Sequence, residues 1–166
     1  RFSPPQRRVY EIVLAAQQAG IAAVAPGRGV NDAHEAALRV LIDGLRELKL
    51  LEGSFDEIVE KRSFRRFYMH RTGHWLGMDV HDVGAYFAQG GDHRRLEPGM
   101  VVTVEPGLYF PEDDAAIPPD LRGIGVRIED DVLVTADGNE VLTRACPKAI
   151  DAIESEVGRI PLRGPG

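Results

Sequence analysis

The sequence predicts an α+β fold, with two helices in its first third and a group of short strands after them. Residues 3–53 carry apolar side chains at helical spacing. From Phe67 onward the chain changes to short apolar runs that glycine and proline interrupt, which is typical of strands and turns. Helices followed by a group of strands favour the α+β class. A length of 166 residues with 43% hydrophobic residues suits one globular domain.

The first helix is predicted to begin after Ser3, because a serine followed by two prolines is typical of an N-cap and a first turn. Its apolar face is formed by Val9, Ile12, Val13 and Ala16, and it is expected to end near Gly20. A second helix is predicted from about Val30, with Asn31 or Asp32 as its cap. Its buried face is formed by Ala36, Leu38, Leu41, Ile42 and Leu45, and residues 50–53 are expected to close it.

Short strands are predicted for residues 100–104, 125–128, 132–135 and 140–143. Residues 136–139 are typical of a hairpin turn between the last two strands. The proline-rich and acid-rich segment 110–123 is expected to be a surface loop. A final short helix is predicted within 147–157, followed by a loose tail at 159–166.

The formal net charge of −6 argues against general binding of nucleic acid, which favours a basic face. A local basic cluster is expected to be a solvated surface; it consists of Lys61, Arg62, Arg65 and Arg66. No apolar run approaches the roughly 20 residues of a membrane span, and no segment resembles a signal peptide. We therefore predict neither a nucleic-acid partner nor a membrane partner.

The single cysteine, Cys146, excludes an internal disulfide and is compatible with a reducing compartment, so a cytoplasmic location is predicted. With no histidine near it in sequence, Cys146 is expected to be a small buried apolar residue rather than a nucleophile. The sequence begins at Arg1 rather than methionine, and we expect a processed or truncated chain.

Three of the five histidines, His70, His74 and His81, lie within twelve residues. Thr72 and Gly73 make a poor helix interior, so a turn is predicted there. A lone histidine is more often a hydrogen-bonded structural residue than a ligand. Three in one glycine-punctuated segment make a functional role an equally good interpretation.

Two glutamates follow the histidines on separate predicted strands. Glu105 ends its strand, because Pro106 cannot donate to a ladder. Alternation places Glu129 and Arg127 on one face of the second strand. Taken alone, Glu105 favours a solvated acid at a turn and Glu129 a structural acid paired with Arg127 or a metal. Together, imidazole and carboxylate groups from separate segments suit a borderline or hard divalent metal.

Three phrases of the sequence, in this order, resemble the pita-bread metallopeptidases. They are HRTGHWLGMDVHDVG at 70–84, LEPGMVVTVEPGLY at 96–109 and RGIGVRIEDD at 122–131. That family includes aminopeptidase P, prolidase, methionine aminopeptidase and creatinase. The VHDVG and VEPGLY phrases point to its proline-directed branch, and the context of Trp75 is more similar to bacterial aminopeptidase P than to prolidase.

The resemblance implies a partial pita-bread fold, in which helices pack on a curved antiparallel sheet. It covers residues 1–157, which are expected to be the C-terminal part of a catalytic domain, with 158–166 as a tail. It also implies a pair of divalent ions, most often manganese, although zinc and cobalt are alternatives. A homo-oligomer is expected for the full-length protein.

By resemblance, the metal ligands are His74, Glu105 and Glu129. The predicted catalytic residues are His70, His81 and Glu105. The two histidines are expected to hold the substrate and the tetrahedral intermediate, and Glu105 to move a proton. Tyr109 and Arg127 match residues that brace the ligands from behind. The sequence departs from the family at Arg71, where a glycine commonly follows the first histidine, so altered substrate scope is expected.

The family's two remaining ligands are aspartates, which the resemblance places before Arg1. Glu105 and Glu129 supply only two of the four carboxylates that a pair of ions requires. We therefore expect this chain alone to bind at most one ion, weakly, and to be inactive by itself.

The predicted reaction of the complete enzyme is release of an N-terminal residue from peptides with proline at the second position, by attack of a metal-activated water. One alternative is a prolidase, which cleaves only Xaa-Pro dipeptides. Another is a non-catalytic pita-bread module that binds a peptide or a protein. The full set of three histidines and two glutamates favours the enzyme.

Overall fold

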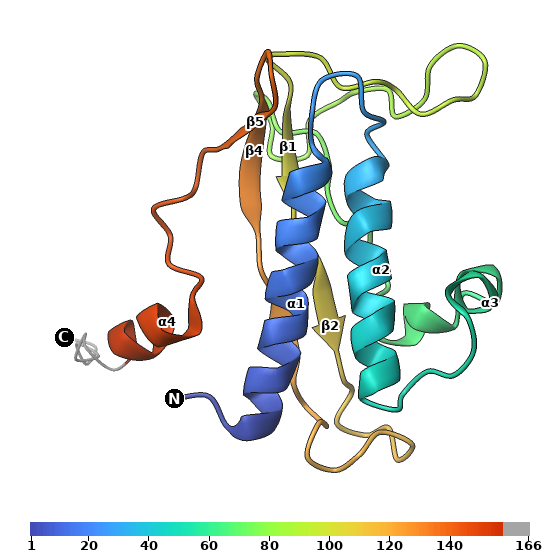
Figure 1. Cartoon of the computed structure of the whole chain (residues 1–166), viewed down its shortest axis with the longest axis vertical. Helices are drawn as coiled ribbons and strands as arrows, with labels where there is room; N and C mark the ends of the chain where they lie inside the picture. The colour runs from blue at the N-terminus through green and yellow to red at the C-terminus, as the bar shows by residue number, and fades with distance from the viewer. Residues whose placement is uncertain (158–166) are drawn as a thin grey trace.

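The computed structural model of the chain describes residues 1–157, and the tail predicted at 158–166 lies outside the described residues. Helices α1 (Pro4–Ala23) and α2 (Asp32–Glu47) lie side by side in front of the strands (Figure 1). Two short helical segments, α3 (Phe55–Glu60) and η1 (Ser63–Arg66), lead from α2 to the strands. The strand region follows, and α4 (Ile150–Glu156) ends the described chain. This order of elements confirms the α+β prediction.

Helix α1 begins as the sequence predicts. The Ser3 hydroxyl accepts a hydrogen bond from the Gln6 backbone N–H, and the Gln6 side chain accepts one from the Ser3 N–H. The helix continues to Ala23, three residues beyond the expected end at Gly20. Gly20 is buried against the strands, where an added Cβ would lie 2.9 Å from Val104 Cγ1. This glycine therefore permits close packing of α1 on the sheet and does not end the helix.

Helix α2 has Asn31 as its N-cap residue, but the Asn31 side chain makes no capping bond. Asp32 Oδ2 instead accepts a hydrogen bond of 3.1 Å from the Gly29 N–H. The following elements α3 and η1 were not predicted, although Ser54 and Glu57 form a second capping box that is visible in the sequence. The basic cluster around η1 is exposed, as expected.

The described strands form two small antiparallel sheets. One has the order β1 (Val101–Val104), β4 (Asp130–Val134), β5 (Asn139–Val141), and the other pairs β2 (Gly107–Tyr109) with β3 (Gly125–Arg127). Each predicted strand overlaps one of these elements. The predicted end of the strand before Pro106 is confirmed. Strand β2, which resumes directly after the proline, was not predicted.

The two sheets share one register. Val104 faces Asp130 and Gly107 faces Arg127, so the residues between them continue the same antiparallel alignment. The ladder is interrupted where Glu105 and Pro106 face Glu129 and Ile128, and there the Ile128 N–H donates to the Pro106 carbonyl at 3.3 Å. Strands β1 and β2 therefore run antiparallel to β3 and β4 as one two-stranded ribbon. The two glutamates, Glu105 and Glu129, lie where the pairing of this ribbon is interrupted.

Two apolar clusters hold the helices on the strands. The larger joins α1 and α2 to β2, and the smaller lies beneath β1 and β4 around Trp75. The predicted surface loop at 110–123 contains no helix or strand, but Ile117 and Leu121 anchor it in the larger cluster. Among the described residues, no helix is long and apolar enough to span a membrane.

The prediction that Cys146 is buried is wrong, because its side chain is exposed. The turn that contains it is held through its backbone. The Lys148 ammonium donates to the carbonyl oxygens of Thr143 and Cys146 and pairs with the buried Asp130 at 2.7 Å. These bonds fix the main chain and leave the thiol outside the core.

Candidate metal centre

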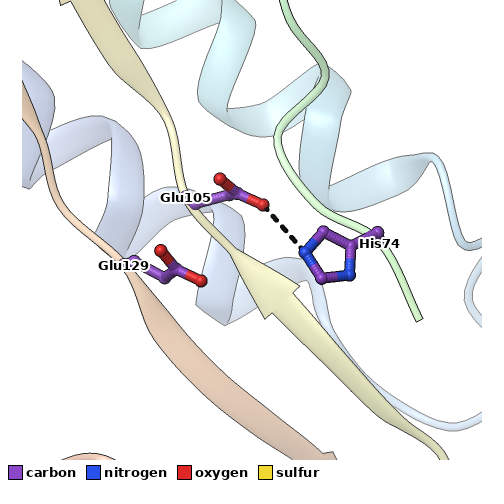
Figure 2. Close-up of side chains that lie close together, drawn as sticks. All are labelled: His74, Glu105 and Glu129. Carbon is purple, nitrogen blue, oxygen red and sulfur yellow. Dashed lines mark ion pairs between the residues drawn. The ribbon is translucent and has the colours of Figure 1, made fainter. Parts of the chain in front are cut away.

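Three side chains from separate segments converge at the interruption of the ribbon. His74, Glu105 and Glu129 each offer one ligand atom, and these three atoms lie within 4.8 Å of one another. Figure 2 shows the two carboxylates on neighbouring strands and the imidazole on the chain segment that runs beside them. The convergence expected from the sequence is therefore present, at a spacing close to that of ligands about 2 Å from one shared ion.

The segment that carries His74 runs along β1 as an irregular edge. The Glu105 N–H donates to the Thr72 carbonyl at 2.6 Å, and the Thr103 N–H donates to the His74 carbonyl at 3.0 Å. Gly73 lies between these bonds, and a Cβ there would be 1.9 Å from the Thr103 carbonyl oxygen. Only glycine permits this close backbone approach. The sequence predicted a turn rather than a helix here, and the segment is indeed not helical. Its backbone hydrogen bonds to β1 fix the position of His74.

Glu105 is buried, with 9% of its surface exposed, so the interpretation as a solvated acid is wrong. One carboxylate oxygen accepts from the Thr103 hydroxyl at 3.1 Å, and the other lies 3.3 Å from the Arg127 guanidinium. The same Thr103 hydroxyl accepts from the His74 N–H at 3.0 Å. Thr103 thus links two of the three candidate ligands, a contact that orients both.

Glu129 directly faces Glu105 across the two strands. Like charges opposite each other on neighbouring strands are destabilising. Partial burial, followed by the charges of Glu105 and Asp131, raises the pKa of Glu129 above its usual value. A cation between the two carboxylates would remove this repulsion, so the arrangement favours a metal ion at this position.

The His74 ring is oriented as a metal-binding imidazole. Its Nδ1 lies 2.9 Å from the Trp75 carbonyl, which only accepts, so Nδ1 carries the proton. The neutral ring then presents the Nε2 lone pair to the Glu105 carboxylate 3.3 Å away. Two acceptors in contact require a cation between them or a proton on the ring. A hydrogen bond from the remote nitrogen to a carbonyl is the usual support of a histidine ligand.

A second hydrogen-bonded group lies behind Glu105, centred on the Tyr109 hydroxyl. Arg127 Nε donates to this hydroxyl at 2.8 Å, and His70 Nε2 lies 2.8 Å from it. His70 Nδ1 donates to the Arg71 carbonyl, so in the neutral ring Nε2 accepts from Tyr109. The structure therefore brings together Tyr109, Arg127 and Glu105 as expected, and both nitrogens of His70 are engaged within the protein.

His81 lies on the other side of the centre, with its ring 4.3 Å from the His74 ring between centroids. Its side chain is exposed, and no hydrogen bond to the ring is found within residues 1–157. The three histidines and Glu105 line one open cavity of about 530 Å³, together with Arg71, Gly73, Tyr86, Phe87, His93 and Arg127. A cavity of this size accommodates a short peptide.

His34, for which the sequence indicated no role, contacts the segment between His70 and His74. Its Nδ1 lies 2.8 Å from the Thr72 hydroxyl, which is also 2.6 Å from the buried Tyr68 hydroxyl. Burial, together with the charges of Arg71 and His70, lowers the pKa of His34 to about 4. No spacing in the sequence relates α2 to Thr72, so only the tertiary structure reveals this contact.

The donor set fits a divalent metal ion. One imidazole and two carboxylates are ligands for hard or borderline ions, and the close approach of the acceptors leaves a place that a cation would stabilise. Helices on an antiparallel ribbon, with such ligands beside an open cavity, indicate a protein that binds a divalent metal ion.

The chain belongs to metallopeptidase family M24, whose model matches residues 1–136. It is 50% identical over 156 residues to an Xaa-Pro aminopeptidase of Haemophilus influenzae, covering 93% of this chain and 35% of that protein. Xaa-Pro aminopeptidase 1 of Streptomyces coelicolor is 51% identical, over 92% of this chain and 31% of its own. The chain spans about a third of the length of the curated relatives it matches.

The fold is similar to solved structures of the same kind. Aminopeptidase PepP of Pseudomonas aeruginosa superposes with a TM-score of 0.90 at 55% identity, over 93% of this chain and 35% of that one. Aminopeptidase P from E. coli with the inhibitor Pro-Leu gives 0.86 at 43% identity, over 93% and 35%. These matches confirm the expected partial pita-bread fold. The exact domain limits of 1–157 stay a prediction.

Proposed function

We propose that the full-length protein is a metal-dependent aminopeptidase that releases the N-terminal residue from peptides with proline at the second position. The observation that carries this proposal is the convergence of His74, Glu105 and Glu129 within 4.8 Å beside an open cavity. The substrate class is supported by the names of the relatives, which are Xaa-Pro aminopeptidases. Because this chain covers about a third of them, the activity is proposed for the full-length protein.

The proposed metal is manganese, with zinc or cobalt as alternatives, held by His74, Glu105 and Glu129. A divalent ion bound there would supply Lewis-acid polarisation of the scissile carbonyl and an activated water as nucleophile. By resemblance to the family, a second ion would need two aspartates from outside these residues. We expect the chain alone to bind at most one ion, weakly, because two carboxylates do not balance two divalent charges.

Glu105 is the proposed proton carrier, which takes a proton from the attacking water and passes it to the leaving proline nitrogen. It is buried and held on both oxygens, so its carboxylate is fixed in place before substrate binds. Arg127 and Tyr109 support it from behind, and Arg127 compensates part of its charge.

His81 is the proposed donor to the oxyanion that develops on the scissile carbonyl, since its exposed ring lines the cavity. His70 is proposed to contact the substrate backbone. It can donate there only after it exchanges its bond with Tyr109, because both its nitrogens are engaged in this structure.

Hydrolysis of Ala-Pro-Ala and of Ala-Ala-Ala by the full-length enzyme tests the proposal. We expect release of alanine from the first peptide only, loss of activity with a chelator, and recovery when manganese is returned. Cleavage of the dipeptide Ala-Pro with rejection of Ala-Pro-Ala would support the prolidase alternative. Metal binding without cleavage of either would support a non-catalytic module.

The remaining expectations stay predictions. These are a homo-oligomer for the full-length protein, a cytoplasmic location, and the absence of nucleic-acid and membrane partners. The net charge of −6 supports the prediction that nucleic acid is not a partner.

A further inference from the structure

Arg71 is an arginine at the mouth of the candidate active site. It directly follows His70, its side chain is exposed, and it lines the same cavity as His74, His81 and Glu105. The roles assigned above to the metal ligands and to the Tyr109 group do not use it. Its guanidinium donates a hydrogen bond to the side-chain oxygen of Asn31.

Asn31 holds this guanidinium without neutralising it. Asn31 is buried, with 9% of its surface exposed, and its amide nitrogen donates to Glu35 Oε1 at 2.7 Å. This bond fixes the amide so that its oxygen faces Arg71. Among residues 1–157, no carboxylate lies within ion-pair distance of Arg71. Arg71 is thus anchored by a neutral partner and keeps its full charge.

The Arg71 guanidinium has N–H groups that remain available to a ligand. It carries five N–H groups in a fixed fork, and its only side-chain hydrogen bond within the described part of the chain is the one to Asn31. The free N–H groups match the geometry of a carboxylate, which arginine binds through two parallel hydrogen bonds.

The charge of the cavity differs between its two sides. Glu105 and Glu129 make the metal side negative until a cation binds. On the α2 side the cavity is lined by Arg71, and its positive charge adds to the effect of burial in lowering the pKa of the nearby His34. A peptide with free ends carries a positive amino end, which Arg71 repels, and a negative carboxyl end, which Arg71 attracts.

We propose that Arg71 is a specificity-determining residue that binds a carboxylate of the peptide substrate, on the C-terminal side of the bond that is cut. This role rests on the proposed function, because it assumes a peptide in the cavity. The terminal carboxylate is present in every free peptide, and an acidic side chain after the proline offers the same chemistry.

The test is steady-state hydrolysis by the metal-loaded full-length enzyme of peptide pairs that differ in one charge. Ala-Pro-Ala is compared with its C-terminal amide, and Ala-Pro-Glu amide with Ala-Pro-Gln amide. We expect wild-type kcat/KM to favour the charged member of at least one pair by about tenfold, mainly through KM, as suits one charge-assisted contact. The pair that responds identifies the source of the carboxylate.

Three variants separate the charge of Arg71 from other effects. R71Q should bring the preferred ratio close to one, and R71K should keep an intermediate ratio, because lysine retains the charge but not the fork. R65Q makes the same change at an exposed arginine that does not line the cavity, and it should leave the ratio at the wild-type value. Metal content measured on each variant shows that the centre is loaded.

The outcomes distinguish this inference from the proposed function. Cleavage of charged and neutral peptides at equal rates by wild type, or a preference that persists in R71Q, contradicts the role of Arg71 and leaves the proposed function intact. A loaded enzyme that cleaves none of the four peptides contradicts the proposed function, and the role of Arg71 fails with it.

Discussion

The strand ribbon and the loop before it hold their functional side chains in opposite ways. Glu105 is buried at the interruption of a ladder that is paired in register on both sides, and backbone bonds tie His74 to the neighbouring residues of β1. The loop that carries His81 is exposed, with Met78, Val80 and Val83 at 100%, 69% and 91% exposure. Figure 1 shows the chain before β1 extending away from the helices.

This difference separates two tasks. Metal ligands need fixed spacing before the ion arrives, and the paired strands on either side of the glutamates supply it. A group that contacts substrate benefits from a segment that adjusts, and the loop bonds mostly to itself, as in the contacts of Gly77 with Asp79 and of Ala88 with Asp92. Changes in the ribbon should therefore affect metal binding and folding, whereas changes in the loop should affect turnover alone.

The largest expected effect is at Glu105. Replacement by glutamine keeps the shape of the side chain but removes the charge that takes a proton, so kcat of the full-length enzyme should fall by about 10³-fold. The full-length variant should also bind manganese less tightly, because a charged ligand is lost. Steady-state kinetics and metal analysis measure the two effects. Turnover within tenfold of wild type would contradict the assignment.

The loop should show a smaller and different effect. His81→Gln in the full-length enzyme should lower kcat by about 10²-fold, as expected when one donor to an oxyanion is lost. Metal content and the thermal midpoint should match wild type, since the ring touches no ligand oxygen and is exposed. Loss of metal from this variant would show that His81 belongs with the ligands.

Gly73 tests whether the ladder determines the site. Gly73→Ala places a Cβ where only 1.9 Å separates it from the Thr103 carbonyl oxygen, so the edge segment must move off β1. We expect the free energy of unfolding, measured with a denaturant, to fall by about 2–3 kcal/mol. Gly138→Ala is the matched control, because nothing lies within 4 Å of its Cβ. Equal stability of the two variants would contradict the tight ladder.

The smallest effect concerns His34 and pH. Its folded-state pKa is lowered to about 4, so the folded state favours the neutral ring. The stabilisation is complete above the ordinary pKa of about 6.5 and is lost as pH falls from there through 4. His34→Gln should flatten this part of the stability curve, with a difference of at most about 2 kcal/mol after allowance for solvent screening. Parallel curves for the two proteins would contradict the prediction.

Much of the fold could be predicted because its signals are local. Ser3 with two prolines marks the start of α1, and Pro106 marks the end of β1. The predictions from sequence failed where tertiary packing determines the local structure. Gly20 was interpreted as a helix end, yet it serves contact with Val104. Strand β2 has only three residues and follows a proline, so no local pattern reveals it.

In the candidate site, too, some features could be predicted from the sequence and others depend on tertiary contacts. The residue types indicated a metal site, the resemblance to the family nominated His74, Glu105 and Glu129 as its ligands, and the structure brings their tips together. That the two glutamates face each other could not be predicted, because the register depends on pairing across the whole ribbon. His34 and Asn31 lie on or beside α2 and were missed because only tertiary contacts link them to Thr72 and Arg71.

The central claim is that His74, Glu105 and Glu129 bind one common ion. Anomalous diffraction from crystals of the manganese-loaded full-length protein tests it directly. We expect a manganese peak within about 2.0–2.4 Å of His74 Nε2 and of one oxygen from each glutamate. A peak that contacts none of these atoms, or His74 turned away from an ion held by the glutamates, would contradict the claim.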